Sequence, residues 1–138
     1  MEEKDTYKTL ARPSEEFLLK EKNSKFFARA FPVSSQEEVK EILEEIQKTH
    51  HKAGHHCYAW QLGREEEEFH YRANDDGEPG NSAGMPIYGQ IQSFGLTQVM
   101  IVVTRYFGGV KLGVGGLIQA YKNAAKMALE ESQIISKT

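Results

Sequence analysis

Hydrophobic and polar positions along the first third of the chain predict a strand segment followed by a helix. Residues 25–31 (Lys-Phe-Phe-Ala-Arg-Ala-Phe) have a β-like composition, and Pro32 ends the segment. Apolar residues then recur at helical spacing from Val39 to Ile46, behind serines that can cap a helix. One or two strands in the first thirty residues and a helix over residues 35–49 are therefore expected.

The period changes to two after this helix. Apolar and polar positions alternate over residues 56–62 and again over residues 69–73, so that residues 63–66 predict a hairpin turn. Residues 74–81 are dense in turn formers and predict an exposed or ligand-facing loop. An antiparallel pair of strands with a polar loop behind it follows from this pattern.

The last third of the chain predicts a helix, a strand and a longer helix. Residues 86–94 read as a short helix that Gly95 stops. Residues 99–104 are apolar without alternation, as in a central strand covered on both faces. A long helix with inward-facing alanines begins near residues 113–116. The order of elements predicts an α+β fold, a two-layer sandwich in which a mixed or antiparallel sheet carries helices on one face.

Composition narrows the class of protein. The chain has 138 residues, of which 39% are hydrophobic, so one domain over residues 1–138 is expected rather than a disordered chain. The longest apolar run, residues 99–103, is far too short to cross a membrane, and the N-terminal sequence MEEKDTYKTL lacks a secretion signal. A cytosolic protein with no membrane partner is expected. The single cysteine, Cys57, excludes an internal disulfide.

Charge is distributed unevenly along the chain. Residues 1–84 hold 12 Lys and Arg against 18 Asp and Glu, whereas residues 85–138 hold 5 against 2, within a net charge of −3. Because a general nucleic-acid binder shows a larger basic excess, any contact with phosphate must come from a local patch.

A glycine-rich segment after the central strand is the first candidate site. Its glycines are Gly108, Gly109, Gly113, Gly115 and Gly116. Their order fits neither a P-loop nor GxGxxG, so a nucleoside triphosphatase and a dinucleotide enzyme are not supported. The glycines alone are equally explained by a tight turn and close packing of the last helix. The flanking Arg105, Tyr106 and Lys111 favour a loop that clamps a phosphate or stacks on a base.

The turn-rich loop and the strand before it supply the second candidate set. Its members are Asp75, Asp76, Glu78, His55 and His56. Such groups can hold a divalent metal or act as an acid and base, but their spacing matches no metal motif, and a surface turn or a salt bridge to Arg105 explains them as well. No metal site and no cofactor are expected. Cys57 faces away from its neighbour His56 and predicts a buried, inert thiol.

Three motifs in the same order resemble the N-terminal domain of the IMPACT/YigZ family. They are His55-His56-Cys57-Tyr58-Ala59-Trp60, then Asp75-Asp76-Gly77-Glu78-Pro79 with Ser82-Ala83-Gly84-Met85-Pro86, and then the segment from Thr104 to Leu117 with Ala120-Tyr121. The resemblance covers residues 15–132. The sequence departs from the family where Val114 replaces a common threonine.

The resemblance implies a fold like the second domain of ribosomal protein S-five and the fourth domain of elongation factor G. It also implies a cytosolic location. The eukaryotic member is a translational regulator that binds the activator of a starvation-sensing kinase, whereas the bacterial members have no settled activity. Bacterial members usually carry a second, ferredoxin-like domain, which is not expected here because the chain stops at Thr138.

The family motif also implies a set of site residues: His55, His56, Asp75, Asp76, Glu78, Arg105, Tyr106, Gly108, Gly109, Lys111, Gly113, Gly115 and Gly116. We interpret them as one polar surface, in which Asp75 or Glu78 orients Arg105 and the glycine turn offers backbone donors to RNA phosphate. No catalytic residue is assigned.

Three functions remain open on this basis. The first is a non-enzymatic, translation-associated module that binds RNA, the ribosome or a regulatory protein partner. The acidic helix surface from Glu37 to Glu45 suits a protein partner better than RNA. The second is a small metal-dependent hydrolase that uses Asp75, Asp76, Glu78 and the two histidines. The third is a structural interaction domain whose motifs only maintain the fold. The oligomeric state is open, with a monomer as the expectation.

Overall fold

The structure, a computed structural model, describes residues 6–138 of the chain. Residues 1–5, part of the segment without a secretion-signal pattern, lie outside the described residues. The elements follow one another as β1 (Tyr7–Leu10), β2 (Phe17–Glu21), β3 (Ser24–Pro32), α1 (Gln36–Thr49), β4 (His55–Leu62), the short 3-10 helix η1 (Glu66–Glu68), β5 (His70–Asn74), α2 (Gly84–Ser93), β6 (Val99–Tyr106), α3 (Gly113–Glu130) and β7 (Ile134–Lys137).

A five-stranded antiparallel sheet forms the centre of the molecule. Its strand order is β2-β3-β6-β4-β5, so that β6 lies in the middle with β3 and β4 on either side. Residues 99–105 of β6 are all buried, because helices cover both of its faces. The prediction of a covered central strand is confirmed, as is the α+β class with an antiparallel sheet.

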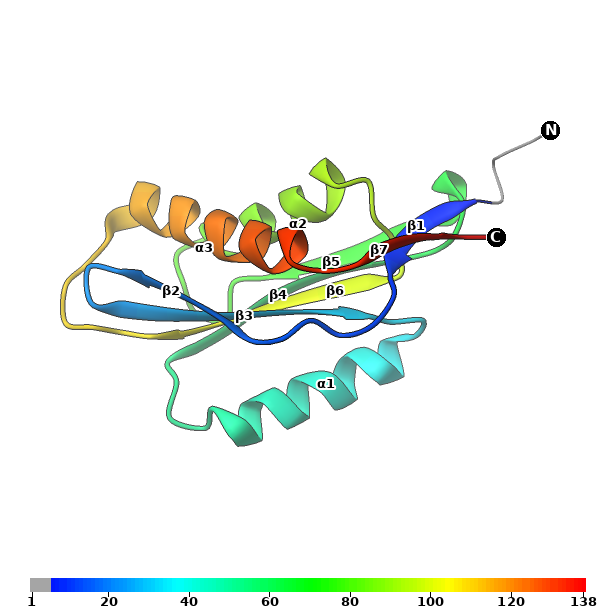
Figure 1. Cartoon of the computed structure of the whole chain (residues 1–138). Helices are drawn as coiled ribbons and strands as arrows, with labels where there is room; N and C mark the ends of the chain where they lie inside the picture. The colour runs from blue at the N-terminus through cyan, green and yellow to red at the C-terminus, as the bar shows by residue number, and fades with distance from the viewer. Residues whose placement is uncertain (1–5) are drawn as a thin grey trace.

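Helices cover both faces of this sheet (Figure 1). α2 and α3 lie on one face, over a large apolar cluster that includes Phe26, Ala59 and Ile101. α1 lies on the other face, where Val39 and Ile46 join a second cluster. The expected placement of the helices on one face therefore holds for α2 and α3 only. Alternation along the strands makes both faces apolar, and each face needs its own cover.

The second cluster explains why α1 packs where it does. Trp60, Met100 and Val102 point to the face opposite α3, and α1 supplies the apolar side that buries them. The helix begins directly after its N-cap residue Ser35, whose hydroxyl oxygen accepts the N–H of Glu38 at 3.2 Å. The Glu38 carboxylate in turn accepts the Ser34 hydroxyl at 2.6 Å, which lowers the pKa of Glu38. The predicted helix over residues 35–49 is confirmed.

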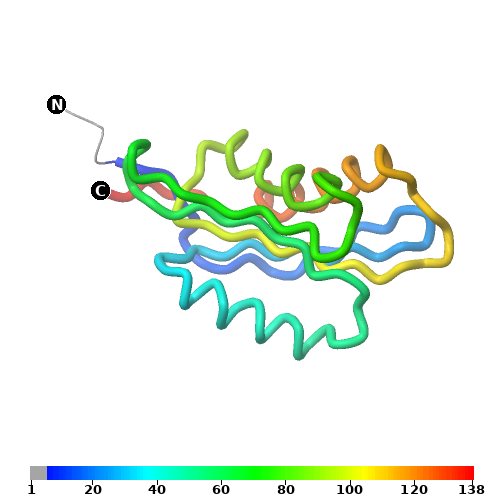
Figure 2. The backbone as a smooth tube through the Cα atoms, turned by 180° about the vertical axis from the view of Figure 1, so that it is seen from behind, coloured from blue at the N-terminus to red at the C-terminus, as the bar shows by residue number. Residues whose placement is uncertain are grey.

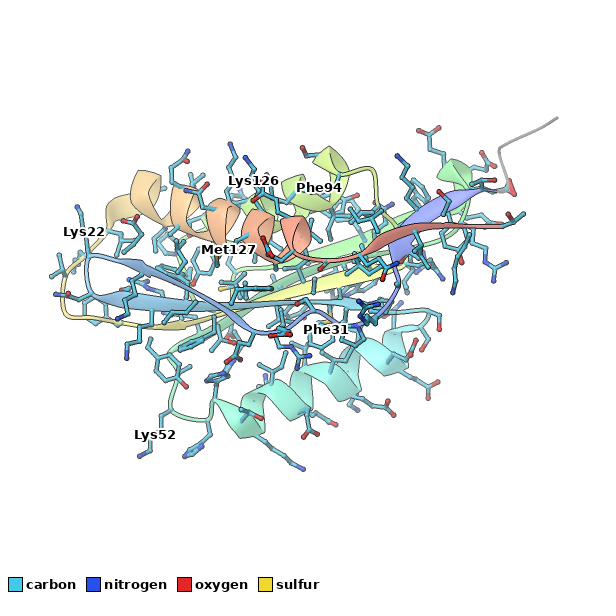
Figure 3. The ribbon with its side chains drawn as sticks, viewed as in Figure 1. Lys22, Phe31, Lys52, Phe94, Lys126 and Met127 are labelled. Carbon is cyan, nitrogen blue, oxygen red and sulfur yellow. The ribbon has the colours of Figure 1, made fainter. Side chains whose placement is uncertain are left out.

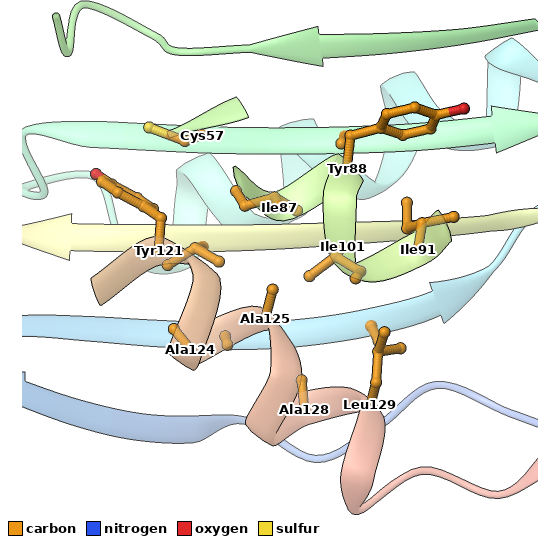
Figure 4. Close-up of a cluster of buried hydrophobic side chains, with 14 of the residues drawn as sticks. Cys57, Ile87, Tyr88, Ile91, Ile101, Tyr121, Ala124, Ala125, Ala128 and Leu129 are labelled. Carbon is orange, nitrogen blue, oxygen red and sulfur yellow. The ribbon is translucent and has the colours of Figure 1, made fainter. Parts of the chain in front are cut away.

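Small side chains let α3 approach the sheet closely. Ala120, Ala124, Ala125 and Ala128 are fully or almost fully buried, and Figure 4 shows three of them with Tyr121 over the strands. The predicted inward-facing alanines are thus confirmed. In the part of the chain that the structure describes, no helix is both long enough and apolar enough to cross a membrane.

The pattern of hydrophobic and polar residues did not predict the two-stranded ribbon that joins the two ends of the chain. β1 and β7 pair antiparallel, from Tyr7 opposite Lys137 to Leu10 opposite Ile134, and the two ends lie side by side in both views (Figures 1 and 2). Strands of four residues carry little periodic signal, and their partners are separated by nearly the whole chain. The hairpin connection between β4 and β5 is also longer than predicted, because η1 lies within it.

Candidate functional site

Three connections meet at one end of the molecule. The β2–β3 turn lies beside the segment that joins β6 to α3, on the left in Figure 1 and on the right in Figure 2. The contact is made at Gly108, whose N–H donates to the Ser24 hydroxyl oxygen at 3.2 Å. A Cβ at Gly108 would lie 2.1 Å from the backbone of Asn23, so only glycine permits this approach. The loop after β5 reaches the same end through Glu78.

A buried ion pair organises this end. Arg105 is 5% exposed and Glu78 is 8% exposed. Nη1 of Arg105 donates to both carboxylate oxygens of Glu78, at 3.0 and 2.9 Å, while Nη2 donates to the Ser24 hydroxyl oxygen at 3.3 Å. Among the described residues, Nε of Arg105 has no hydrogen-bond partner. The guanidinium is therefore neutralised and held from two sides before any ligand arrives.

Two further side chains complete the surroundings of Glu78. The Tyr121 hydroxyl donates to one carboxylate oxygen, and burial raises the pKa of Tyr121 well above its ordinary range, so that the phenol keeps its proton. Nε2 of His55 lies 3.7 Å from the other oxygen. Nδ1 of His55 contacts the carbonyl oxygen of Asp76 at 2.8 Å. Because a carbonyl oxygen can only accept, Nδ1 of His55 carries a proton.

Asp75 and Asp76 hold the loop together. The Asp75 carboxylate accepts the N–H groups of Asn81, Ala83 and Gly84 at 2.8, 3.1 and 2.8 Å, and so satisfies the first backbone donors of α2. The Asp76 carboxylate accepts the N–H of His56 at 2.7 Å. Glu78, and not Asp75, is the acid that orients Arg105.

Five of the site residues that the motif implies, His55, Glu78, Arg105, Lys111 and Gly113, line a pocket at the start of α3, which we call the α3 pocket. Its volume is about 380 Å³. The lining residues are His55, Glu78, Pro79, Arg105, Phe107, Lys111, Leu112, Gly113, Val114 and Leu117. The polar groups form a compact set around the ion pair, and the remaining wall is mainly apolar.

Other motif residues lie on the opposite face of the sheet. Tyr106 follows Arg105 in β6 and so points toward α1, where its hydroxyl contacts Nδ1 of His50 at 2.5 Å. Nε2 of His50 contacts a carboxylate oxygen of Glu16 at 2.8 Å. His56 also faces this side, 3.3 Å from the Thr104 hydroxyl oxygen, and partial burial lowers the pKa of His56. Tyr106 and His56 therefore do not line the α3 pocket.

The glycines differ in what they do. Gly109 and Gly113 have φ of +88° and +77°, a region that favours glycine, and they shape the connection around Lys111. Gly115 and Gly116 lie in the first turn of α3. Within residues 6–138, no side-chain hydrogen bond caps this first turn, whose N–H groups lie at the positive end of the helix dipole.

Sequence reasoning missed Phe107, Ser24 and Tyr121 as parts of the site. Phe107 carries a usable signal, because it is a large aromatic residue directly before two glycines, and it is 58% exposed. Tyr121 belongs to the family motif, but nothing in the sequence links it to Arg105 and Glu78. Ser24 carries no signal, and both residues reach the ion pair through the packing of distant elements.

The side chains proposed for a metal-dependent hydrolase are not arranged as metal ligands. Among residues 6–138, no group of three or more His, Cys, Asp or Glu side chains is placed to hold a metal ion. The carboxylates of Asp75 and Asp76 bind backbone N–H groups, and Glu78 is paired with Arg105. The hydrolase alternative therefore has no geometric support.

Cys57 is expected to resist alkylation in the folded protein. Its thiol is fully buried and donates to the carbonyl oxygen of Asp75 at 3.1 Å, and burial raises its pKa far above neutrality. Iodoacetamide should modify it about a hundredfold or more slowly in buffer than in denaturing urea, as followed by mass spectrometry. Equal rates in the two conditions would contradict this burial.

Comparison with known proteins identifies relatives over most of the chain. The profile of the Impact N-terminal domain matches residues 22–129. IMPACT family member YvyE of Bacillus subtilis is 37% identical over 132 residues, which are 96% of this chain and 59% of that protein. The chain spans less than two thirds of the length of the curated relatives that it matches first.

Two solved structures are similar in fold. A crystal structure described as that of a hypothetical protein superposes with a TM-score of 0.92 at 32% identity, over 97% of this chain and 65% of that chain. The two-domain translational regulator Yih1 gives a TM-score of 0.55 at 26% identity, over 86% of this chain and 44% of that chain.

Proposed function

This chain belongs to the Impact N-terminal domain family, and from that membership we propose that it is a cytosolic, translation-associated module that binds RNA, including the RNA of the ribosome. The family relationship supports a role in translation, because the structural neighbour Yih1 is described as a translational regulator. The chain matches only part of Yih1, so the role of that whole protein is carried over here as a proposal.

The distribution of charge along the chain is the observation that carries this proposal. No acidic residue occurs between Glu78 and Glu130, a segment that contains α2, β6 and all of α3 except its last residue. Lys111, Lys122 and Lys126 are all exposed in that segment. Figure 3 shows Lys126 pointing outward from α3 and Lys22 at the end where the three connections meet. A modest net charge thus hides a small group of exposed lysines, which is the kind of local patch that RNA phosphate requires.

The uncapped start of α3 adds to this group of exposed lysines. Its first-turn N–H groups lie at the positive end of the helix dipole, next to Lys111. Of the residues that the sequence suggested as phosphate ligands, Arg105 contributes least to phosphate binding, because Glu78 already neutralises its charge. We therefore assign the phosphate contacts to Lys111, Lys122 and the backbone of the first turn rather than to Arg105.

Replacing Lys111 and Lys122 with alanine is expected to weaken RNA binding in a salt-dependent way. Both side chains are exposed, so the variant should fold as the parent does. The slope of log affinity against log salt concentration should become shallower by about 0.7 for each phosphate that the variant no longer neutralises. Co-sedimentation with ribosomes and titration of labelled RNA, each at low and high salt, measure the change.

A matched control removes two lysines from the other face. Lys40 and Lys48 are exposed on α1, and the Lys40→Ala, Lys48→Ala variant has the same change in net charge. It should bind RNA as the parent does. If both variants lose the same RNA affinity, the effect comes from net charge alone and not from the position of the lysines. If the parent protein binds no RNA at low salt, the proposal is overturned.

A regulatory protein partner is the second candidate, and α1 is the surface that favours it. Its exposed side carries five glutamates, at positions 37, 38, 41, 44 and 45, against Lys40 and Lys48. A shallow groove of about 570 Å³ runs between α1 and the β4–β5 edge, with Leu43, Tyr58 and Trp60 in its lining. Ribosome binding that persists in high salt and in the Lys111→Ala, Lys122→Ala variant would favour this face.

A further inference from the structure

We propose that the α3 pocket receives one unpaired RNA base, so that the protein prefers single-stranded RNA to duplex RNA. The inference rests on the proposed function and specifies the form of RNA that the same site takes. It follows from the size of the pocket, the neutral character of its floor and the exposed aromatic ring at its edge.

The walls and size of the pocket suit a flat, weakly polar group. Pro79, Leu112, Val114 and Leu117 supply apolar surface, and the volume of about 380 Å³ lies near the lower end of the range for small-ligand sites. A base with part of its ribose fills such a space. Val114 is 52% exposed, so the apolar wall is open to a ligand that arrives from solvent.

The floor of the pocket does not suit a phosphate group. Its one arginine is paired with Glu78 through two hydrogen bonds, and the carboxylate would repel an anion placed against it. A neutral base avoids that repulsion. Nε of Arg105 is a buried donor without a partner among residues 6–138, and Nε2 of His55 lies 3.7 Å from a carboxylate oxygen of Glu78. The edge of a base offers acceptors to the Arg105 donor.

Phe107 supplies the stacking surface. The ring is 58% exposed although it lies at the pocket, and Cζ of Arg105 is 5.5 Å from its centroid. The guanidinium thus holds the ring through a cation–π contact, which reduces the ordering that binding must impose. Aromatic side chains bind successive bases of single strands in this way, whatever the base.

The groups outside the pocket complete the fit to a nucleotide. Lys111 is exposed at the pocket edge, and the first turn of α3 begins two residues later. A base held inside therefore leaves its phosphate next to the lysine and the helix start. A base within a duplex is stacked on both sides and cannot enter, which is the physical origin of the expected preference.

Single-stranded and duplex RNA distinguish this proposal in one titration. The probes are a fluorescein-labelled oligo(U) of about ten nucleotides and its duplex with oligo(A), followed by fluorescence anisotropy at low salt. Phe107→Ala should weaken binding of the single strand by at least about fivefold and leave binding of the duplex unchanged. The matched control is Phe69→Ala, because Phe69 is also exposed, at 40%, and lies outside the α3 pocket.

A second readout follows the pocket directly. Uridine monophosphate added to methyl-labelled protein should shift the resonances of Leu112, Val114 and Leu117, and these shifts should vanish in Phe107→Ala. Equal affinity for single strand and duplex, with Phe107→Ala behaving as Phe69→Ala, would overturn the base pocket and leave RNA binding by Lys111 and Lys122 intact. Failure of the parent to bind either RNA would instead overturn the proposed function itself.

Discussion

Replacing Arg105 with alanine lowers the free energy of unfolding by an expected 3–5 kcal/mol, about the cost of leaving one buried charge without its partner. Arg105 and Glu78 have side chains that are 6% and 3% exposed, and the guanidinium donates two of the hydrogen bonds that the carboxylate receives. Without it, the Glu78 carboxylate keeps, among residues 6–138, only the Tyr121 hydroxyl and the more distant His55. Ser24 also loses a donor.

A double-mutant cycle in urea tests this expectation. Arg105→Ala, Glu78→Ala and the double variant are unfolded in parallel, and the double variant should cost at least about 1 kcal/mol less than the sum of the single variants. The reason is that removal of both charges leaves no uncompensated ion. Additive losses, or a loss below about 1 kcal/mol for Arg105→Ala, would contradict a buried, coupled pair. Arg105→Ala is for the same reason a poor probe of ligand binding.

Gly108→Ala is expected to destabilise the protein by about 3 kcal/mol, the upper part of the usual range for overpacking. The added Cβ would lie 2.1 Å from the backbone of Asn23 and 2.6 Å from the N atom of Ser24. These are backbone atoms of the β2–β3 turn, which cannot move aside as a flexible side chain does. The substitution therefore separates the turn from the β6–α3 connection and breaks the hydrogen bond from Gly108 to Ser24.

The matched control is Gly115→Ala in the same glycine-rich segment. A Cβ at Gly115 would meet no atom of the described part of the chain within 4 Å, and Gly115 lies in the first turn of α3. Alanine there should raise stability by about 0.5–1 kcal/mol, because it reduces the freedom of the unfolded chain. Thermal or urea unfolding of both variants measures the contrast. Equal losses of stability in the two variants would contradict this, because they would show that any substitution in the glycine-rich segment is destabilising, whether or not the added Cβ meets the β2–β3 turn.

Local periodicity was sufficient for the main elements of the fold. The helical spacing from Val39 to Ile46 and the apolar run of β6 are each visible within a few consecutive residues, so the sequence predicts both. The sequence did not predict the β1–β7 ribbon or the second helical layer, because each depends on partners that are distant in sequence. Trp60 and Met100 show this for α1, whose apolar side is easy to recognise but whose face of the sheet is not.

The candidate site shows the same division at the level of single residues. Grouping by motif predicted one surface that contains both Arg105 and Tyr106. The structure places them on opposite faces, since consecutive strand residues alternate, and Tyr106 reaches His50 while Arg105 reaches Glu78. The motif also brought together Asp75 and Glu78, which have different tasks: one caps the start of α2 and the other neutralises Arg105.

The sequence by itself determined the family, the α+β class, the central strand and the segments from which the site is built, because these rest on local composition and on motifs in a set order. Only the tertiary structure decided which side chains of those segments face one another. The pairing of Arg105 with Glu78, the contact of Gly108 with the β2–β3 turn and the exposure of Phe107 arise when elements distant in sequence pack together. Such contacts leave no periodic trace along the chain, since each depends on the partner that packing brings to it.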